Sequence, residues 1–439
     1  MNNLIVGLGA TGMSCVRYLT RRGQSCVVMD KGQPAADRLE ACRELGVQVH
    51  AETWSRDLVE SADRIWLSPG VPLADPIWQG VRDRITSDVA EFLAERQVPV
   101  IGVTGSNGKS TVTAWIEHVA SSVGIRCMAA GNIGVPCLEM LDAPADLVVL
   151  ELSSFQLEML DCPGLDVAVL LNVSQDHMDR YADMHAYAEA KRRIFRGARV
   201  AVFNADDPET RPDPGLQASR LPFGREAGTQ GWKVNADSVP ATLCHDGLSV
   251  LKESDIQLPG LHNLYNAAAV LAVMSARGVT PERCLGALKS FRGLPHRCRK
   301  VAEVGGVAWY NDSKGTNVGA TLAAVAGVAR RSNAVHLLLG GLGKGQDFAP
   351  LRSLSAQVSQ AWAFGEDAQR IAEAVGDAFP VHCVETLAQA VEGAAREAKP
   401  GEAVLLSPAC ASFDQFKSYA DRGESFERLV HIMAGEDVA

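Results

Sequence analysis

Short apolar runs alternate with amphipathic segments along almost the whole chain, and this alternation restricts the fold more than any other feature. The runs LIVGLG, CVVMD, VPVIGVTG, LVVLELS, VAVLLN, VAVFNADD, HLLLGG and AVLLSPA each lead into Gly, Ser, Asp or Asn. Parallel strands buried on both faces have this continuous apolar character, and helical crossovers must connect them. The pattern therefore predicts an α/β fold whose functional loops lie at the carboxyl ends of parallel strands.

The length of 439 residues is enough for about three domains. We expect an N-terminal Rossmann-like domain at residues 1–88 and a central P-loop ATPase-like domain with a parallel sheet at 89–293. A C-terminal Rossmann-like domain is expected at 294–439. Residues 210–257 are rich in polar and turn-forming residues, which predicts irregular or hairpin structure inside the central domain.

Composition excludes several classes of function. The formal net charge of −10 disfavours binding to nucleic-acid backbones. Eleven scattered cysteines without a C-x-x-C pair indicate reduced thiols in the cytoplasm. No apolar run approaches the roughly 20 residues that a membrane-spanning helix needs, and no signal-peptide pattern opens the chain. Nothing in the sequence indicates an obligate oligomer, so we expect a monomer.

The segment IGVTGSNGKST at residues 101–111 joins a predicted strand to a helical pattern. It departs from the strict phosphate-loop motif, because Val103 stands where the first glycine is expected. Glycines still free the backbone N–H groups for phosphate oxygens, while the lysine supplies a cation and the serine a hydroxyl for Mg²⁺. We predict that ATP phosphates contact Gly105, Ser106, Asn107, Gly108, Lys109, Ser110 and Thr111.

Two further strand ends carry acidic residues. Glu151 lies inside the apolar LVVLELSS, where a carboxylate is costly unless a cation binds it. Mg²⁺ is expected at a second strand-end acid beside a P-loop, and an ion pair in the core is the alternative. In LLNVSQDHMDRY, Asp176, His177 and Asp179 follow another strand. For His177 a metal or phosphate role and a structural role both remain open.

Lys191 stands out by its place on a predicted helix. The less polar residues of DMHAYAEAKRRIF share one helical face, and Lys191 falls on that face. Burial there would lower its pKa, and a neutral amine can react with CO₂ to give a carbamate. Such a carbamate would offer oxygen ligands to Mg²⁺. The alternative is a lysine whose stem packs inward while its amine reaches solvent.

The first strand is followed by VGLGATG, which contains Gly7, Gly9 and Gly12 in the G-x-G-x-x-G spacing. A second strand ends at Asp30, close to the offset expected for a ribose-binding acid. The motif reports a phosphate at a helix N-terminus, and NAD(P) is one candidate. No catalytic group for hydride transfer is evident nearby, which favours another nucleotide. LSPGVP, with Ser68, would form a second loop at the same sheet edge.

Taken together and in order, the motifs resemble those of the Mur ligases of peptidoglycan synthesis. They are GVTGSNGKST, GNIG, ELSSFQLE, NVSQDHMDRY, LHNLYNAAAV, GLPHR, NDSKGTN and LLSPACASFDQFKSYADRGESF, and they extend over all three expected domains. The resemblance implies a ligase in which ATP and Mg²⁺ activate the carboxylate of UDP-N-acetylmuramoyl-L-alanine as an acyl phosphate. The amine of D-glutamate, to which SPACASFDQF points, would then displace phosphate through a tetrahedral intermediate.

The same resemblance assigns roles by position. Lys109 would hold the β- and γ-phosphates, and Lys314 would reach the reacting phosphate. One Mg²⁺ would lie on Ser110 and Glu151, and a second on His177 and a carbamylated Lys191. The catalytic residues are then Lys109, Glu151, His177, Lys191 and Lys314. Adenine and ribose would be held by Asn266, Arg297 and Asp312. The UDP-substrate would contact Gly9, Ala10, Thr11, Ser68, Asn132 and His177. The carboxylates of D-glutamate would be bound by Thr316, Lys344, Ser412 and Tyr419.

Two alternatives remain at this level. A folylpolyglutamate synthase shares the central and C-terminal logic, but the complete N-terminal unit with VGLGATG counts against it. A nucleotide-sensing regulatory protein would instead hold NAD(P) at Gly7–Gly12 and ATP at the P-loop. The uridine contacts around Lys31 and Gly32 stay open, because some relatives carry Thr-Arg there.

Overall fold

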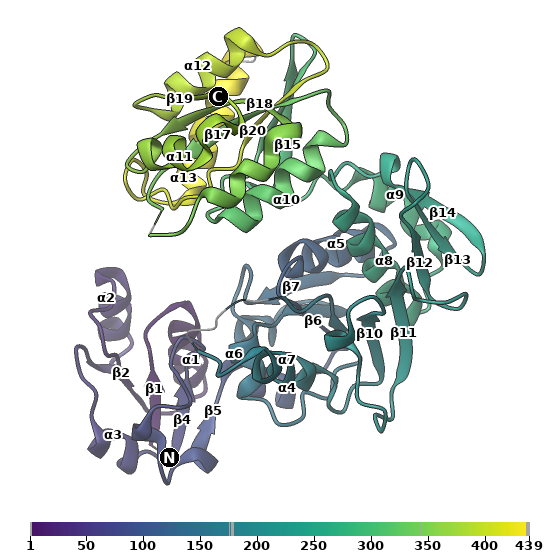
Figure 1. Ribbon diagram of the computed structural model, residues 1–439. Coiled ribbons are helices and arrows are strands. Elements are labelled where there is room, and N and C mark those ends of the chain that lie inside the picture. The colour runs from purple at the N-terminus through teal and green to yellow at the C-terminus, as the bar shows by residue number, and fades with distance from the viewer. Residues whose placement is uncertain (1, 175, 177–179, 344, 436–439) are drawn as a thin grey trace. The chain divides into compact units, whose positions relative to one another are not determined.

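The computed structural model describes residues 2–174, 176, 180–343 and 345–435. The chain divides into two compact units, and Figure 1 labels most of their helices and strands. The first unit comprises the residues up to Asn235 together with Leu243–Val250 and Tyr265–Leu288. The second comprises Ala236–Thr242, Leu251–Leu264 and the chain from Lys289 onward. Parallel strands dominate the sheets, which confirms the expected α/β fold class.

The N-terminal sheet is five-stranded, with the order β3-β2-β1-β4-β5 and parallel pairing throughout. Its strands are β1 (Asn3–Val6), β2 (Cys26–Met29), β3 (Gln48–His50), β4 (Arg64–Leu67) and β5 (Ile85–Thr86). Its helices are α1 (Ala10–Arg21), α2 (Ala36–Glu44) and α3 (Arg56–Ser61). The strand order reverses between β1 and β4, which is where Rossmann-like sheets place ligands.

The glycine loop after β1 depends on close backbone contact. A Cβ added to Gly12 would lie 2.0 Å from the carbonyl oxygen of Gly7, so only glycine fits in this turn of α1. Leu8 donates its backbone N–H to Asp30 at 2.6 Å, and the hydroxyl of Ser68 donates to the Gly7 carbonyl at 2.9 Å. The carboxylate that ends β2 therefore stabilises the glycine loop itself.

A nine-stranded sheet forms the central part, in the order β14-β13-β12-β11-β10-β9-β6-β8-β7. Its strands are β6 (Val100–Thr104), β7 (Cys127–Gly131), β8 (Leu147–Glu151), β9 (Val167–Leu170), β10 (Val200–Asn204), β11 (Ser219–Gly224), β12 (Trp232–Asn235), β13 (Thr242–His245) and β14 (Leu248–Lys252). Its helices are α4 (Asp88–Glu95), α5 (Lys109–Ser122), α6 (Ser154–Glu158), α7 (Met184–Arg192), α8 (Leu261–Ala276) and α9 (Pro281–Ser290). The turn-rich segment 210–257 contributes β11 to β14, so it extends the sheet.

Strand register brings the predicted motifs of the central sheet to one edge. β6 lies between β8 and β9, with Val103 opposite Glu151 and Thr104 opposite Leu170. The P-loop follows β6 directly, and the segment 171–174 follows β9. Because all three strands are parallel, their carboxyl ends place the P-loop, Glu151 and this segment side by side.

The C-terminal sheet has six strands in the order β15-β16-β20-β17-β18-β19, and only β15 and β16 pair antiparallel. The strands are β15 (Arg299–Val304), β16 (Val307–Asn311), β17 (Val335–Gly340), β18 (Val358–Phe364), β19 (Val381–Cys383) and β20 (Ala403–Leu406). The helices are α10 (Val318–Ala329), α11 (Ala368–Val375), α12 (Leu387–Glu397) and α13 (Tyr419–Met433). Fully buried β17 and β20 form its centre.

Through the described part of the chain, no helix is long and apolar enough to cross a membrane. No disulfide joins any of the eleven cysteines, and several of these thiols lie in the cores of the sheets.

Candidate functional site

The P-loop turns into α5 through a glycine that no other residue could replace without strain. Gly108, the residue before the helix, has a φ of 84°, in the left-handed region. A Cβ added there would also lie 2.9 Å from the side-chain oxygen of Asn266 on α8. Lys109 folds back so that its amine donates to the carbonyls of Gly105 at 2.8 Å and Ser106 at 3.0 Å. Asn266, predicted to hold adenine or ribose, thus lies against the phosphate loop.

Polar contacts fasten the P-loop to the segment after β9. Ser106 donates its N–H to the Asn172 carbonyl at 2.9 Å and its hydroxyl to the Ser174 carbonyl at 2.9 Å. The N–H of Asn107 donates to the side-chain oxygen of Asn172 at 2.8 Å. Two loops from neighbouring strands therefore form one anchored structure, as phosphate-binding loops require.

Lys191 is buried in α7, with only 1% of its surface exposed, as its place on the apolar face predicts. Its amine donates to the Gly105 carbonyl at 3.0 Å and lies 4.5 Å from the centre of the Tyr187 ring. Burial, assisted by the nearby charge of Lys109 and opposed by Asp176, lowers the pKa of Lys191 to about 7. A substantial fraction of this amine is therefore neutral near pH 7.

Glu151 ends β8 with a carboxylate that is 2% exposed. One oxygen accepts from the side-chain amide of Asn132 at 2.7 Å. Within the described residues the other oxygen, Oε2, is buried without a hydrogen-bond partner. A buried carboxylate oxygen without a hydrogen-bond partner, on the strand next to the P-loop strand, has the chemistry that Mg²⁺ prefers, so the residues here fit a magnesium ion.

The predicted second metal site falls partly outside the described residues, because His177 lies there, as does Asp179. Among the residues that the structure does describe, no group of three His, Cys, Asp or Glu gathers as a metal site. An unmodified lysine is not a ligand for Mg²⁺, so Lys191 could contribute to this site only as a carbamate. What the structure shows is that its amine is buried.

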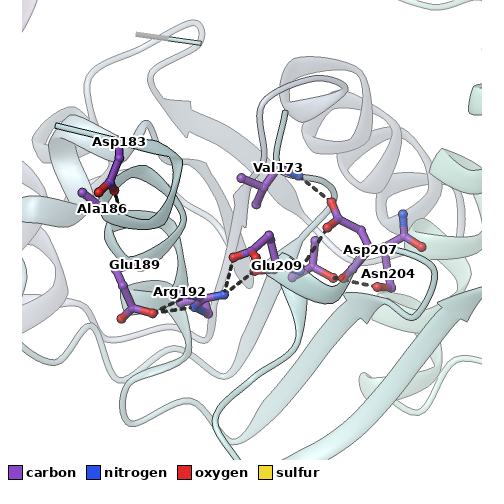
Figure 2. Close-up of polar contacts among 9 residues, drawn as sticks. Val173, Asp183, Ala186, Glu189, Arg192, Asn204, Asp207 and Glu209 are labelled. Carbon is purple, nitrogen blue, oxygen red and sulfur yellow. Dashed lines mark hydrogen bonds and ion pairs between the residues drawn. The ribbon is translucent and has the colours of Figure 1, made fainter. Parts of the chain in front are cut away.

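Sequence reasoning missed a network that connects the segment after β9 to the helix of Lys191 (Figure 2). Asp207, after β10, accepts from the N–H of Val173 at 2.7 Å and from that of Glu209 at 3.0 Å. Arg192 of α7 donates to the Glu209 carboxylate at 2.9 Å and to Glu189 at 2.9 Å. The acidic strand end NADD was the available signal, since functional side chains gather at such ends.

The N-terminal residues predicted for the UDP-substrate lie at the start of α1 and beside it. Gly9 precedes the helix, and Ala10 and Thr11 open it without any acidic residue in the first turn. Ser68 follows β4, the strand beside β1 at the reversal of strand order. An anion at this place would meet backbone N–H groups and the positive end of the helix dipole.

A cavity of about 380 Å³ lies at the carboxyl ends of the C-terminal strands. It is lined by Thr316, Asn317, Leu342, Gly343, Gln346, Ala411, Ser412, Phe413 and Tyr419. Three of the four residues predicted for D-glutamate, Thr316, Ser412 and Tyr419, therefore meet in one cavity. The fourth, Lys344, lies outside the described residues.

Lys314 and Asp312 come from the loop after β16. The Lys314 amine donates to the Tyr419 hydroxyl at 3.3 Å and lies 4.6 Å from the centre of that ring, which places it near the cavity. Asp312 is 9% exposed and accepts from the N–H of Cys298 and the hydroxyl of Ser407. Burial raises the pKa of Asp312 to about 7, and Arg297 opposes that shift.

Two further polar residues line the cavity, although the sequence analysis did not predict them. They are Asn317, after β16, and Gln346, after β17. Gln346 donates to the Ala409 carbonyl at 2.6 Å and accepts from Val318 at 3.1 Å, which braces the loop after β17. Asn317 caps α10 by accepting from Ala320 at 2.8 Å. The motif NDSKGTN marked the loop of Asn317, whereas no quoted motif included Gln346.

The α/β architecture with three sheets and a P-loop after β6 is that of a nucleotide-dependent enzyme. Three family models match consecutive stretches of the chain. "Mur ligase MurD-like, N-terminal domain" matches residues 1–87, "Mur ligase middle domain" residues 103–274, and "Mur ligase, glutamate ligase domain" residues 296–410. The chain belongs to the Mur ligase family.

Relatives with similar sequences match this chain over nearly its full length. A UDP-N-acetylmuramoylalanine–D-glutamate ligase of Hahella chejuensis is 43% identical over 438 residues, covering 98% of either chain. One of Marinobacter nauticus is 44% identical over 434 residues, covering 97% of each. Among solved structures, the MurF ligase of Thermotoga maritima in complex with ADP has a TM-score of 0.63 at 19% identity, covering 94% of this chain and 95% of that one. That likeness shows the shared fold.

Proposed function

We propose that this chain is the ATP-dependent, ADP-forming ligase that joins D-glutamate to UDP-N-acetylmuramoyl-L-alanine in peptidoglycan precursor synthesis. The observation that carries the proposal is the agreement with relatives of that name at 43% identity over 98% of both chains. A carboxylate is too poor an electrophile for an amine, so ATP must first convert it into an acyl phosphate. The order of motifs and the geometry of the P-loop support that chemistry.

The proposed reaction has two balanced steps. A carboxylate oxygen of UDP-N-acetylmuramoyl-L-alanine attacks the γ-phosphorus of ATP, and ADP leaves. The deprotonated amine of D-glutamate then attacks the acyl carbon, the tetrahedral intermediate forms and loses its proton, and inorganic phosphate leaves. Lys109 would hold the β- and γ-phosphates, while Lys314 would stabilise charge on the transferred phosphoryl group.

Magnesium would supply charge neutralisation between the phosphates and the carboxylate. Ser110 and the orphaned oxygen of Glu151 would hold one ion. His177 and a carbamylated Lys191 would complete a second site, an assignment supported by the burial and lowered pKa of the Lys191 amine. Asn132 would position Glu151 as well as contact the UDP-substrate, since it already donates to that carboxylate.

Substrate roles follow the three proposed domains, 1–88, 89–293 and 294–439. Gly9, Ala10, Thr11 and Ser68 would hold the diphosphate and uridine. Asn266, Arg297 and Asp312 would hold adenine and ribose. Thr316, Lys344, Ser412 and Tyr419 would bind D-glutamate. We also propose a monomer in the cytoplasm, where thiols without disulfides are the rule.

A coupled phosphate-release assay tests this function. Release of phosphate from ATP should require UDP-N-acetylmuramoyl-L-alanine and D-glutamate together, and L-glutamate, L-alanine, L-lysine or meso-diaminopimelate should not replace D-glutamate. Phosphate release indifferent to D-glutamate, combined with tight binding of NAD(P)H, would instead favour a nucleotide-sensing protein. Activity on a folate substrate with glutamate would favour a folylpolyglutamate synthase.

A further inference from the structure

Arg422 is a cation with no exposed surface, in the second turn of α13 behind the C-terminal cavity. Its guanidinium makes five hydrogen bonds. Nε donates to the Ser313 hydroxyl at 3.0 Å, and Nη2 to the Ser313 carbonyl at 2.9 Å and the Cys410 carbonyl at 3.0 Å. Nη1 lies 3.3 Å from the Gly340 carbonyl and 3.4 Å from the Ala411 carbonyl. All the acceptors are neutral.

These acceptors belong to three different loops. Ser313 follows β16, Gly340 ends β17, and the loop with Cys410 and Ala411 follows β20. The same loops supply cavity-lining residues: Thr316 after β16, Leu342 and Gly343 after β17, and Ala411 and Ser412 after β20. A planar guanidinium with donors in a fixed fork sets the distances and angles among all three loops at once. Lysine could not span them.

One of these hydrogen bonds also orients a group of the cavity wall. The N–H and C=O of a trans peptide point in opposite directions. The carbonyl of Ala411 accepts from the Leu342 N–H at 2.9 Å and, at 3.4 Å, from Arg422, so the N–H of Ser412 in the same peptide points away from both donors. The Ser313 hydroxyl, which accepts from Arg422, donates in turn to the carbonyl of Tyr419 at 2.8 Å. Arg422 thereby fixes main-chain groups at both Ser412 and Tyr419.

The charge of Arg422 is not neutralised by direct pairing. In the described part of the chain, no carboxylate hydrogen-bonds to its guanidinium. Burial lowers the pKa of Arg422 to about 10, and the acidic groups Cys410, Asp414 and Asp312 counter that shift. A buried guanidinium with a pKa near 10 stays protonated at neutral pH. Asp414 and Asp312 lie close enough to favour the charged form without hydrogen-bonding to it, so they offset the cost of burying this charge only in part.

We propose that Arg422 is the positioning residue of the amino-acid cavity, holding its three loops in register and giving it a positive potential that selects an amino acid with a side-chain carboxylate. This inference rests on the proposed function, because it takes the cavity to be the site of D-glutamate. Arg422 does not touch the substrate; it acts through Ser412, Tyr419 and the loop after β17. A neutral cavity of the same shape would discriminate less between glutamate and its uncharged analogues.

Three variants test the proposal: Arg422→Lys, Arg422→Met and the milder Ser313→Ala. For Arg422→Met, we expect the KM for D-glutamate to rise about tenfold or more while the KM for ATP changes by about twofold at most. Its preference for D-glutamate over D-glutamine should fall about tenfold. Arg422→Lys should recover the preference for D-glutamate over D-glutamine but not the low KM for D-glutamate. Lysine restores the positive charge but lacks the planar set of guanidinium donors. Arg396→Lys, on the exposed side of α12, is the matched control.

Ser313→Ala keeps the charge of Arg422 and removes only the hydroxyl that accepts from Arg422 and donates to the Tyr419 carbonyl. Because this change is smaller than the loss of Arg422, it separates an effect on the loops from unfolding of the domain. It should raise the KM for D-glutamate severalfold in a protein that stays folded, at unchanged preference over D-glutamine. Equal rises in both KM values, or a full D-glutamate preference in folded Arg422→Met, would overturn the inference. Two measurements on the wild-type protein distinguish failure of the proposed ligase function from failure of the role of Arg422. If the wild type releases no phosphate with D-glutamate but binds D-glutamate more tightly than D-glutamine by calorimetry, the ligase function is overturned and the selectivity of the cavity is supported.

Discussion

Lys109 and Lys191 donate to the same backbone oxygen. The Lys109 amine lies 2.8 Å and the Lys191 amine 3.0 Å from the carbonyl of Gly105. Lys109 comes from the first turn of α5, and Lys191 from the last turn of α7. Two cations at one carbonyl disfavour each other's charged form, and Lys191, which is the more deeply buried, has its pKa lowered. This juxtaposition favours the neutral form of the Lys191 amine.

Replacing Lys191 with alanine should abolish ligase turnover, because no carbamate could then form at this position. Formate, acetate or another short carboxylic acid should restore part of the activity by occupying the space of the missing side chain. Lys233→Ala, on the exposed face of β12, is the control and should keep full turnover. The measurement is phosphate release with and without added acid, together with the ¹³C signal of labelled bicarbonate on each protein. Wild-type-like turnover of Lys191→Ala would remove the carbamate role.

The lowered pKa of Lys191 also predicts how stability depends on pH. The unfolded lysine takes up a proton as the pH falls through its ordinary pKa near 10.5, whereas the folded one does so only near 7. Between these values the unfolded state binds more protons, so this residue makes the free energy of unfolding rise with pH in that window. Below pH 7 both forms are protonated, and its destabilising effect is complete and constant.

Lys191→Met isolates that dependence from the other titrating groups. The variant should be more stable than the wild type near pH 7, and the difference should shrink steadily as the pH approaches 10. Urea unfolding of both proteins at several pH values in bicarbonate-free buffer measures it, since a carbamate would abolish the cationic form. A difference that stays constant between pH 7 and 10 would mean that the buried amine keeps an ordinary pKa.

Asp207 is expected to set the geometry of the segment after β9. Its two oxygens accept from the backbone of Val173 and Glu209, and Glu209 holds Arg192 beside Lys191. Asp207→Asn keeps the shape of the side chain but replaces one acceptor oxygen with an amide NH₂ group, which is a donor. One of the two backbone N–H groups then loses its acceptor, and a buried N–H without an acceptor costs about 1–3 kcal/mol. We expect kcat to fall by about tenfold to a hundredfold.

Hydrogen exchange gives a direct readout of this change, because the Val173 amide should lose protection while the core of β9 keeps it. Asp213→Asn, an exposed carboxylate of the loop before β11, is the matched control and should leave both kcat and exchange unchanged. Normal turnover together with an unprotected Val173 amide would show that this network does not position catalytic groups.

Sequence patterns predicted what depends on local chemistry. The P-loop, the buried carboxylate of Glu151 and the inward face of Lys191 all follow from residue type and spacing. The first two lie at strand ends, and Lys191 lies on the buried face of α7. The distant partners could not be predicted in this way. Asp207 lies 34 positions from Val173, and Arg422 lies 109 positions from Ser313. Such pairs depend on strand order, and no local spacing specifies which strands become neighbours.

Glu151 should bind magnesium through the oxygen that the protein leaves without a hydrogen bond. Glu151→Gln keeps the contact with Asn132 available through its amide oxygen but replaces the anionic ligand with a neutral group. A divalent cation beside ATP should then be held more weakly, so the Mg²⁺ concentration for half-maximal activity should rise about tenfold or more, and kcat should fall. Phosphate release titrated with Mg²⁺ and Mn²⁺ at saturating ATP measures both effects, and Glu226→Gln, at an exposed position after β11, serves as the control. An unchanged Mg²⁺ dependence in folded Glu151→Gln would mean that this carboxylate only braces Asn132, and the metal would have to lie on other residues.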